Sequence, residues 1–260
     1  MLMGGRTMSL IAEYHRQRAW RAWPTVLDAL PPLAGRTVLD LGCGMGDLAA
    51  ELVQRGARVV GFDANQELLE HARKRDLRGA EFRYVDLRTA EDLGVIGDGL
   101  WASFLPAFFP DLTAALARWK RSLRPGAFAA LIEIDDLFGH APVLPKTQEL
   151  LEAYADDSLR AGRYDFRMGR KLAGFLTEAG FTVTQGFTVP DRELSFDGPA
   201  EDEVLAAWRL RFARMKLLQD FCGPGFASLE EDFLACLARE DHRCSARVHC
   251  CLATWEGEKA

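Results

Sequence analysis

The stretch Val38-Leu-Asp-Leu-Gly-Cys-Gly-Met-Gly46 decides how this chain folds, because a short apolar run leads directly into three glycines within five positions. Residues 37–41 are predicted to form a buried strand, and residues 46–55 a helix that ends at Gly56. Glycines between a strand and a helix leave backbone amide groups open to a closely approaching ligand. Several classes of cofactor-binding turn share this pattern.

Short apolar runs alternate with helical periodicity along the chain, which is typical of an α/β fold with a parallel sheet covered by helices. Further strands are predicted over residues 58–63, 81–86, 100–104, 127–134, 181–189 and 246–255. Further helices are predicted to begin near Asn65 and to span 111–123, 169–179, 204–219 and 229–238. Residues 137–167 show no clean strand. No repeat or linker divides the chain, so we expect one domain, residues 1–260, with helical additions at residues 9–30 and in two inserted stretches.

Composition narrows the classes of partner. A chain of 260 residues with 48% hydrophobic content can bury a substantial core, and a net charge of −6 argues against a nucleic-acid partner. The six cysteines show no C-x-x-C spacing, so we expect reduced thiols in place of a metal or disulfide role. No apolar run reaches the length of a signal peptide or a membrane span. We therefore expect a cytoplasmic protein with no membrane partner.

Acids follow two of the predicted strands. Asp63 and Asp86 each close a strand, and the carboxyl ends of parallel strands gather at one edge of the sheet, beside Gly42. A dinucleotide dehydrogenase would carry its third glycine at position 47, where this chain has Asp47, and a negative charge there opposes a pyrophosphate. A dehydrogenase is thus disfavoured, and a purely structural glycine turn remains an alternative.

The series Val38 to Gly46, Val60-Gly-Phe-Asp63, Tyr84-Val-Asp86 and Leu123-Arg-Pro-Gly126 resembles the class I S-adenosylmethionine-dependent methyltransferases over about residues 35–136. A weaker likeness to the small-molecule branch extends over residues 169–181. The resemblance implies a Rossmann-like, seven-stranded, mostly parallel sheet with an antiparallel last strand and helices on both faces. It also implies an N-terminal helical cover (1–34), a cofactor-binding core (35–136) and acceptor-side insertions (137–168 and 199–243) that form a lid.

The resemblance also implies S-adenosylmethionine as cofactor, S-adenosylhomocysteine as product, and a set of contacts. Asp63 is expected at the ribose diol, Asp86 at the adenine amino group and Asp40 near the ammonium group. Tyr14 resembles the aromatic residue that often covers the donor, although helix packing would explain it almost as well. The predicted cofactor-binding residues are Tyr14, Asp40, Gly42, Cys43, Gly44, Gly46, Asp63, Ala64, Asp86, Leu87 and Trp101.

The acceptor is expected to be a small aromatic or apolar molecule. The segment Trp101-Ala-Ser-Phe-Leu-Pro106 replaces the signature of enzymes that methylate amides or exocyclic amines, and no acid follows Trp101 closely enough to predict a metal. Aromatic residues gather in the acceptor-facing stretches, although many of them must be plain core. The predicted acceptor contacts are Phe104, Phe138, Trp208 and Phe212.

A general base is needed only if the acceptor must lose a proton before it attacks. His140 is the preferred candidate because it follows the fifth strand at the ligand edge, and Tyr164 and Asp136 come next. A packing role is the competing interpretation for each of them. We predict methyl transfer to oxygen, nitrogen or carbon of a small acceptor, by a monomer or a homodimer. The alternatives are a regulator that binds S-adenosylmethionine without catalysis and a nicotinamide-dependent oxidoreductase.

Overall fold

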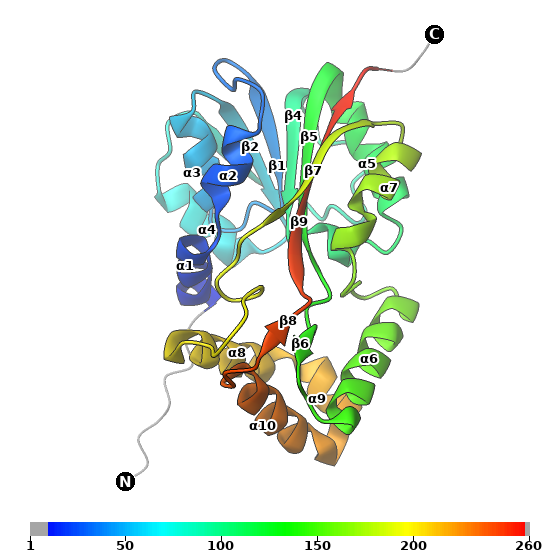
Figure 1. The fold of residues 1–260 in the computed structure, drawn as a ribbon. Helices are drawn as coiled ribbons and strands as arrows, with labels where there is room; N and C mark the ends of the chain where they lie inside the picture. The colour runs from blue at the N-terminus through cyan, green and yellow to red at the C-terminus, as the bar shows by residue number, and fades with distance from the viewer. Residues whose placement is uncertain (1–9, 258–260) are drawn as a thin grey trace.

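A seven-stranded sheet forms the centre of the protein (Figure 1). The structure is a computed structural model that describes residues 10–257. The sheet has the order β3-β2-β1-β4-β5-β9-β7. Its strands are β1 (Thr37–Leu41), β2 (Arg58–Asp63), β3 (Ala80–Tyr84), β4 (Gly97–Ser103), β5 (Leu123–Asp135), β7 (Thr182–Val189) and β9 (Arg247–Trp255). Only β9 of these seven runs antiparallel to its neighbours, β5 and β7, which confirms the predicted mostly parallel sheet with an antiparallel last strand.

Helices cover both faces of this sheet, as predicted, because successive residues of a strand point to opposite sides. On β1, Val38 packs into one core cluster, whereas Leu39 and Leu41 pack into the other. The first cluster includes residues of α2 (Trp23–Asp28), α3 (Asp47–Gln54) and α4 (Gln66–Lys74). The second includes residues of α5 (Leu112–Trp119) and α7 (Leu172–Glu178).

A group of helices lies beyond the carboxyl ends of the parallel strands (Figure 1). It contains α6 (Pro145–Arg160), α8 (Asp202–Arg214), α9 (Lys216–Cys222) and α10 (Phe226–Leu237), with a two-stranded sheet of β6 (His140–Ala141) and β8 (Arg243–Cys244). We call these elements the lid group. They come from the two stretches predicted as acceptor-side insertions. Helix α1 (Leu10–Trp20) lies beside the same end of the sheet, and residues 1–9 of the predicted cover (1–34) lie outside the described residues.

Several boundaries differ from the predictions. The predicted helix 204–219 is two helices, because Met215 has a non-helical backbone (φ −76°, ψ 63°) between α8 and α9. The stretch 137–167, left unassigned from the sequence, contains the 16-residue helix α6. Strand β3 ends at Tyr84, so Asp86 lies in the following loop. Four short 3₁₀ helices complete the described elements: η1 (Pro106–Phe108), η2 (Lys120–Ser122), η3 (Gly169–Lys171) and η4 (Gly223–Gly225). No helix within residues 10–257 combines the length and apolarity that crossing a bilayer requires.

The glycine loop after β1 is held in a conformation that other residues rarely adopt. Gly46 caps the start of α3 with φ 72° and ψ 23°. A Cβ atom placed on Gly46 would lie 2.7 Å from Cζ of Phe82 on β3. The loop is fastened to β2 because the amides of Gly42 and Cys43 both donate to the carbonyl of Phe62, at 2.8 and 3.0 Å. Glycine at position 46 therefore lets α3 pack closely on the sheet.

We predict that Gly46→Ala lowers the free energy of unfolding by about 2–4 kcal/mol, because the added methyl group meets Phe82 in a left-handed backbone. Urea unfolding followed by circular dichroism measures the change. Gly174→Ala is the matched control: a Cβ there meets open space on the exposed side of α7, so it should stabilise by about 0.5–1 kcal/mol. Equal effects of the two substitutions would contradict the close packing at Gly46.

Candidate cofactor and acceptor site

A cavity of about 460 Å³ opens at the carboxyl ends of β1, β2 and β4, next to α1. It collects residues that are far apart in the sequence, as expected for the ligand edge of a parallel sheet. The predicted cofactor residues that line it are Tyr14, Asp40, Gly42, Cys43, Asp63, Ala64, Asp86 and Leu87. Most of the predicted donor site is thus brought together in one place.

Asp63 orders the floor of this cavity. Its Oδ2 accepts a hydrogen bond from the amide of Gly44, and its Oδ1 accepts one from the amide of Asn65, both at 2.8 Å. One carboxylate therefore joins the glycine loop after β1 to the start of α4 after β2. Burial raises the pKa of Asp63, although these backbone donors partly offset the effect. The side chain is fixed and faces the cavity.

Asp40 is a buried carboxylate that lacks a partner. It is 2% exposed, and its Oδ2 has no hydrogen-bond partner within the described part of the chain. Burial, followed by the nearby charge of Asp63, raises the pKa of Asp40 to about 7. An isolated buried carboxylate is costly unless a cation or a donor reaches it. The pair of acids therefore makes this end of the cavity complementary to a positively charged ligand.

Helix α1 covers the glycine loop from the other side. A Cβ atom placed on Gly44 would lie 3.0 Å from Cε1 of Tyr14, so the ring passes directly over the loop. Burial raises the pKa of Tyr14, and Asp63 raises it further, so the phenol stays protonated and can donate. Arg18 of α1 pairs with Glu51 of α3 at 2.8 Å, which fastens the cover to the core. The cavity is thereby closed on its N-terminal side.

Three predicted cofactor residues do not line the cavity. Gly44 and Gly46 act through the backbone, as described above. Trp101 is fully buried and packs edge-on against Trp23, with ring centroids 5.6 Å apart. The alternation of β4 points its side chain into the core beneath α2. The expectation that Trp101 contacts the cofactor is therefore corrected.

His140, the predicted base, lies away from this cavity. It lines a second cavity of about 580 Å³ together with Asp136 and Phe138. His140 Nδ1 lies 3.0 Å from His242 Nε2, and His242 Nδ1 lies 2.9 Å from the carbonyl oxygen of Gly198. Because a carbonyl only accepts, His242 carries its proton on Nδ1, and His140 donates from Nδ1 to the free Nε2 of His242. The imidazole of His140 is thus a packing element of the lid group.

Most of the other predicted catalytic and acceptor residues also lie away from the first cavity. Burial raises the pKa of Tyr164 well above its usual value, and the residue packs between Phe108 and Phe166 without lining the first cavity. Asp136 accepts a hydrogen bond from Ser245 Oγ at 2.8 Å. Trp208 and Phe212 are fully buried inside the lid group. Phe104 is the predicted acceptor contact that does line the first cavity.

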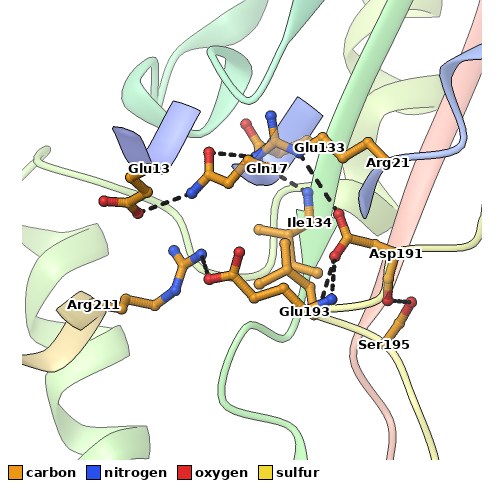
Figure 2. Close-up of polar contacts among 10 residues, drawn as sticks. Glu13, Gln17, Arg21, Glu133, Ile134, Asp191, Glu193, Ser195 and Arg211 are labelled. Atoms are coloured by element: carbon orange, nitrogen blue, oxygen red, sulfur yellow. Dashed lines mark hydrogen bonds and ion pairs between the residues drawn. The ribbon is translucent and has the colours of Figure 1, made fainter. Parts of the chain in front are cut away.

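Sequence reasoning missed a cluster of charged residues on the acceptor side of the cavity (Figure 2). We call this set the polar cluster, and its members are Glu13, Gln17, Arg21, Glu133, Asp191, Glu193 and Arg211. Gln17 and Arg21 line the cavity. Gln17 Nε2 donates to Glu13 Oε1 at 2.9 Å, and Arg21 Nη2 donates to Gln17 Oε1 at 3.0 Å. The four-residue spacing of these three positions was a visible signal of one polar helix face.

Glu133, a member of the polar cluster, was not predicted from the sequence as a site residue. It is fully buried, and its carboxylate accepts from the amide of Ala107 at 3.1 Å and from that of Ile134 at 2.9 Å. Burial raises its pKa to about 7. Glu133 thereby holds η1, which carries Phe108, against the end of β5. A lone acid within the apolar run 127–134 was the sequence signal.

Comparison with known proteins places this geometry in context. Residues 38–126 match the family model described as a methyltransferase domain. Trans-aconitate 2-methyltransferase of Mycolicibacterium gilvum is 32% identical over 195 residues, which cover 71% of this chain and 72% of that protein. The 2-phytyl-1,4-naphtoquinone methyltransferase of Synechococcus elongatus is 33% identical over 147 residues, which cover 54% of this chain and 60% of that protein.

A solved structure shares the fold. Geranyl diphosphate methyltransferase in complex with S-adenosylmethionine superposes with a TM-score of 0.56 at 19% identity, covering 97% of this chain and 91% of that one. The chain spans only 44–60% of the length of several curated relatives that it matches. Within residues 10–257, no group of three or more histidine, cysteine or acidic side chains is arranged to hold a metal ion.

The buried histidine pair generates a prediction about acid stability. Burial, followed by the nearby charges of His242 and Arg211, lowers the pKa of His140 to about 3. Between pH 6.5 and 3 the unfolded chain binds a proton at this position that the folded chain does not. Stability should therefore fall with falling pH by about 1.4 kcal/mol per pH unit for this group.

We expect His140→Asn to be less stable at pH 7 but to lose less stability between pH 6.5 and pH 5 than the unsubstituted protein. Urea unfolding at both pH values measures the difference. The control is His15→Asn, since His15 is an exposed histidine of α1. An unchanged pH dependence in His140→Asn would show that His140 binds protons equally in the folded and unfolded protein, so its pKa is not lowered by folding.

Proposed function

This chain belongs to the S-adenosylmethionine-dependent methyltransferases, and we propose that it transfers the methyl group of S-adenosylmethionine to a small organic acceptor. The observation that carries this proposal is a pair of acids, the buried Asp40 and the half-buried Asp63, beside a glycine-rich loop. Asp40 has an oxygen without a partner among the described residues, and an ammonium group would supply one. A nucleotide diphosphate would be repelled at the same place.

Each residue of the donor end has a proposed contact. The fixed carboxylate of Asp63 would accept from the two ribose hydroxyls, while Asp86 lies on the side of β3 where the adenine amino group would fall. Tyr14 would cover the donor from α1. When bound, S-adenosylmethionine supplies an electrophilic methyl group on a sulfonium. The protein's task is then to align the acceptor with that methyl group and to exclude water.

The location and assembly of the protein are also proposals. All six cysteines have free thiols, which supports a reducing compartment such as the cytoplasm. A net charge of −6 gives no support for a nucleic-acid partner. We propose a monomer or homodimer whose remaining partner is the small acceptor.

Asp63→Ala should weaken S-adenosylhomocysteine binding at least 30-fold, because the ribose hydroxyls lose their shared acceptor and the amide of Gly44 loses its partner. Isothermal calorimetry measures this change. Glu70→Ala, on the exposed side of α4, is the control with the same loss of charge and should bind normally. Undiminished affinity in Asp63→Ala would remove the ribose contact from the site.

A ligand that lacks the 2′-hydroxyl group tests the same contact by changing the ligand in place of the protein. The unsubstituted protein should bind 2′-deoxyadenosylhomocysteine at least tenfold more weakly than S-adenosylhomocysteine. Asp63→Ala should discriminate less than threefold between them, since the interaction is already absent. Equal discrimination by both proteins would show that another residue contacts the hydroxyl.

Catalysis is tested with S-adenosylmethionine carrying a labelled methyl group. The protein, incubated with a small-molecule cell extract, should release S-adenosylhomocysteine and move the label into an acceptor. The Asp63→Ala protein is the control and should do neither at the same donor concentration. Tight donor binding without any label transfer would favour the alternative of a non-catalytic regulator.

A further inference from the structure

Arg21 places a cation in the wall of the cavity on its acceptor side. Its guanidinium carbon lies 3.8 Å from the centroid of the Phe104 ring and 5.7 Å from that of Trp23. The side chain is therefore held against an aromatic surface, which orients its nitrogen atoms without neutralising its charge. Figure 2 shows it reaching from the end of α1 toward the loop after β7.

The neighbours of Arg21 leave part of its hydrogen-bonding capacity unused. Its Nη2 donates to Gln17, a neutral residue, at 3.0 Å. Asp191 forms an ion pair with Arg21, but its carboxylate lies 3.7 Å from Nε, which is too long for a hydrogen bond. Asp191 Oδ1 instead accepts from the amides of Glu193 and Leu194, both at 2.9 Å. Nε of Arg21 is buried and has no acceptor among the described residues.

The surrounding polar cluster does not supply the missing acceptor. Glu193 is engaged by Arg211 at 2.5 Å. Buried nitrogens of Arg16 and Arg211 likewise have no acceptor within residues 10–257. Burial raises the pKa of Glu133 to about 7, so this acid is only partly ionised at neutral pH. The cluster therefore leaves Nε of Arg21 without a hydrogen-bond acceptor.

The same wall offers no base. The described residues that line the cavity include no histidine and no lysine. Its acids, Asp40, Asp47, Asp63 and Asp86, belong to the donor end and its rim. A nucleophile that attacks the methyl carbon from the Arg21 side must therefore bind in a form that needs no deprotonation. A carboxylate meets this condition, because it is ionised at neutral pH without help.

We propose that the acceptor is a carboxylic acid, that Arg21 binds its carboxylate, and that the carboxylate oxygen is methylated. This inference rests on the proposed function. In the step, the carboxylate oxygen forms a bond to the methyl carbon as the methyl–sulfur bond breaks, and the electron pair stays on sulfur. The negative carboxylate and the positive sulfonium cancel to give a neutral methyl ester and a thioether. No proton moves, so no base is needed, and the ester no longer pairs with Arg21.

The test compares acids with their amides. Benzoate, cinnamate, succinate and citrate, and the amide of each, are incubated with S-adenosylmethionine, and methyl products are identified by mass. We expect at least one acid to give its methyl ester and its amide to give no product. Arg21→Gln should raise KM for that acid at least 30-fold, whereas Arg21→Lys should retain part of the affinity. Arg209→Gln, an exposed position on α8, is the control and should leave KM unchanged.

Calorimetry with S-adenosylhomocysteine tests whether Arg21 binds the donor or the acceptor. We expect Arg21→Gln to bind it within threefold of the unsubstituted protein. If this affinity falls at least tenfold while that for 5′-methylthioadenosine stays constant, Arg21 binds the carboxylate of the donor, and the proposal is overturned. Because the acid-against-amide comparison uses the unsubstituted protein, it stands even if Arg21→Gln does not fold.

Two further outcomes separate this inference from the proposed function. If labelled methyl is transferred from the donor in a cell extract but no panel acid is methylated, the carboxylate proposal fails and the proposed function stands. If the unsubstituted protein does not bind S-adenosylhomocysteine, the proposed function fails and the inference fails with it. Equal turnover of an acid and its amide would also overturn the inference.

Discussion

The double hydrogen bond of Asp63 is the constraint on which the site depends. One carboxylate holds the amide of Gly44 and the amide of Asn65, and so joins the loop after β1 to the start of α4. The loop can come this close because Gly44 leaves room for Tyr14 and Gly46 leaves room for Phe82. The same contact that shapes the loop also fixes the carboxylate at the cavity wall. The interaction that holds the loop in place would therefore also orient this carboxylate for the proposed ribose contact.

Charge is distributed unevenly along the cavity. Asp40 and Asp63 make the donor end acidic, and burial, followed by the charge of Asp63, raises the pKa of Asp40. Arg21 places a positive charge in the opposite wall, in an ion pair with Asp191. A cationic donor and an anionic acceptor would each meet the opposite charge, and the field between the two walls would favour only one direction of approach.

Most residues predicted for the donor end line one cavity, because they lie in successive turns at the ends of parallel strands. The strands 37–41 and 58–63 were predicted with the boundaries that the structure shows. Trp101 was misplaced because strand alternation turns its side chain into the core. His140 was misplaced because the chain leaves the sheet after β5 and enters the lid group through β6. The hydrophobic periodicity of a single sequence does not show that the chain leaves the sheet at this point.

The polar cluster was beyond sequence reasoning for a different reason. Its members come from α1, β5, the loop after β7 and α8, so their meeting depends on how the lid group packs on the sheet. The buried Nε atoms of Arg21 and Arg211 lack acceptors among the described residues, and this lowers stability because hydrogen bonds do not repay their desolvation. An anion placed at Arg21 would supply the acceptor that Nε lacks and would recover part of that loss. Binding of the proposed acceptor would then offset part of the cost of burying this guanidinium.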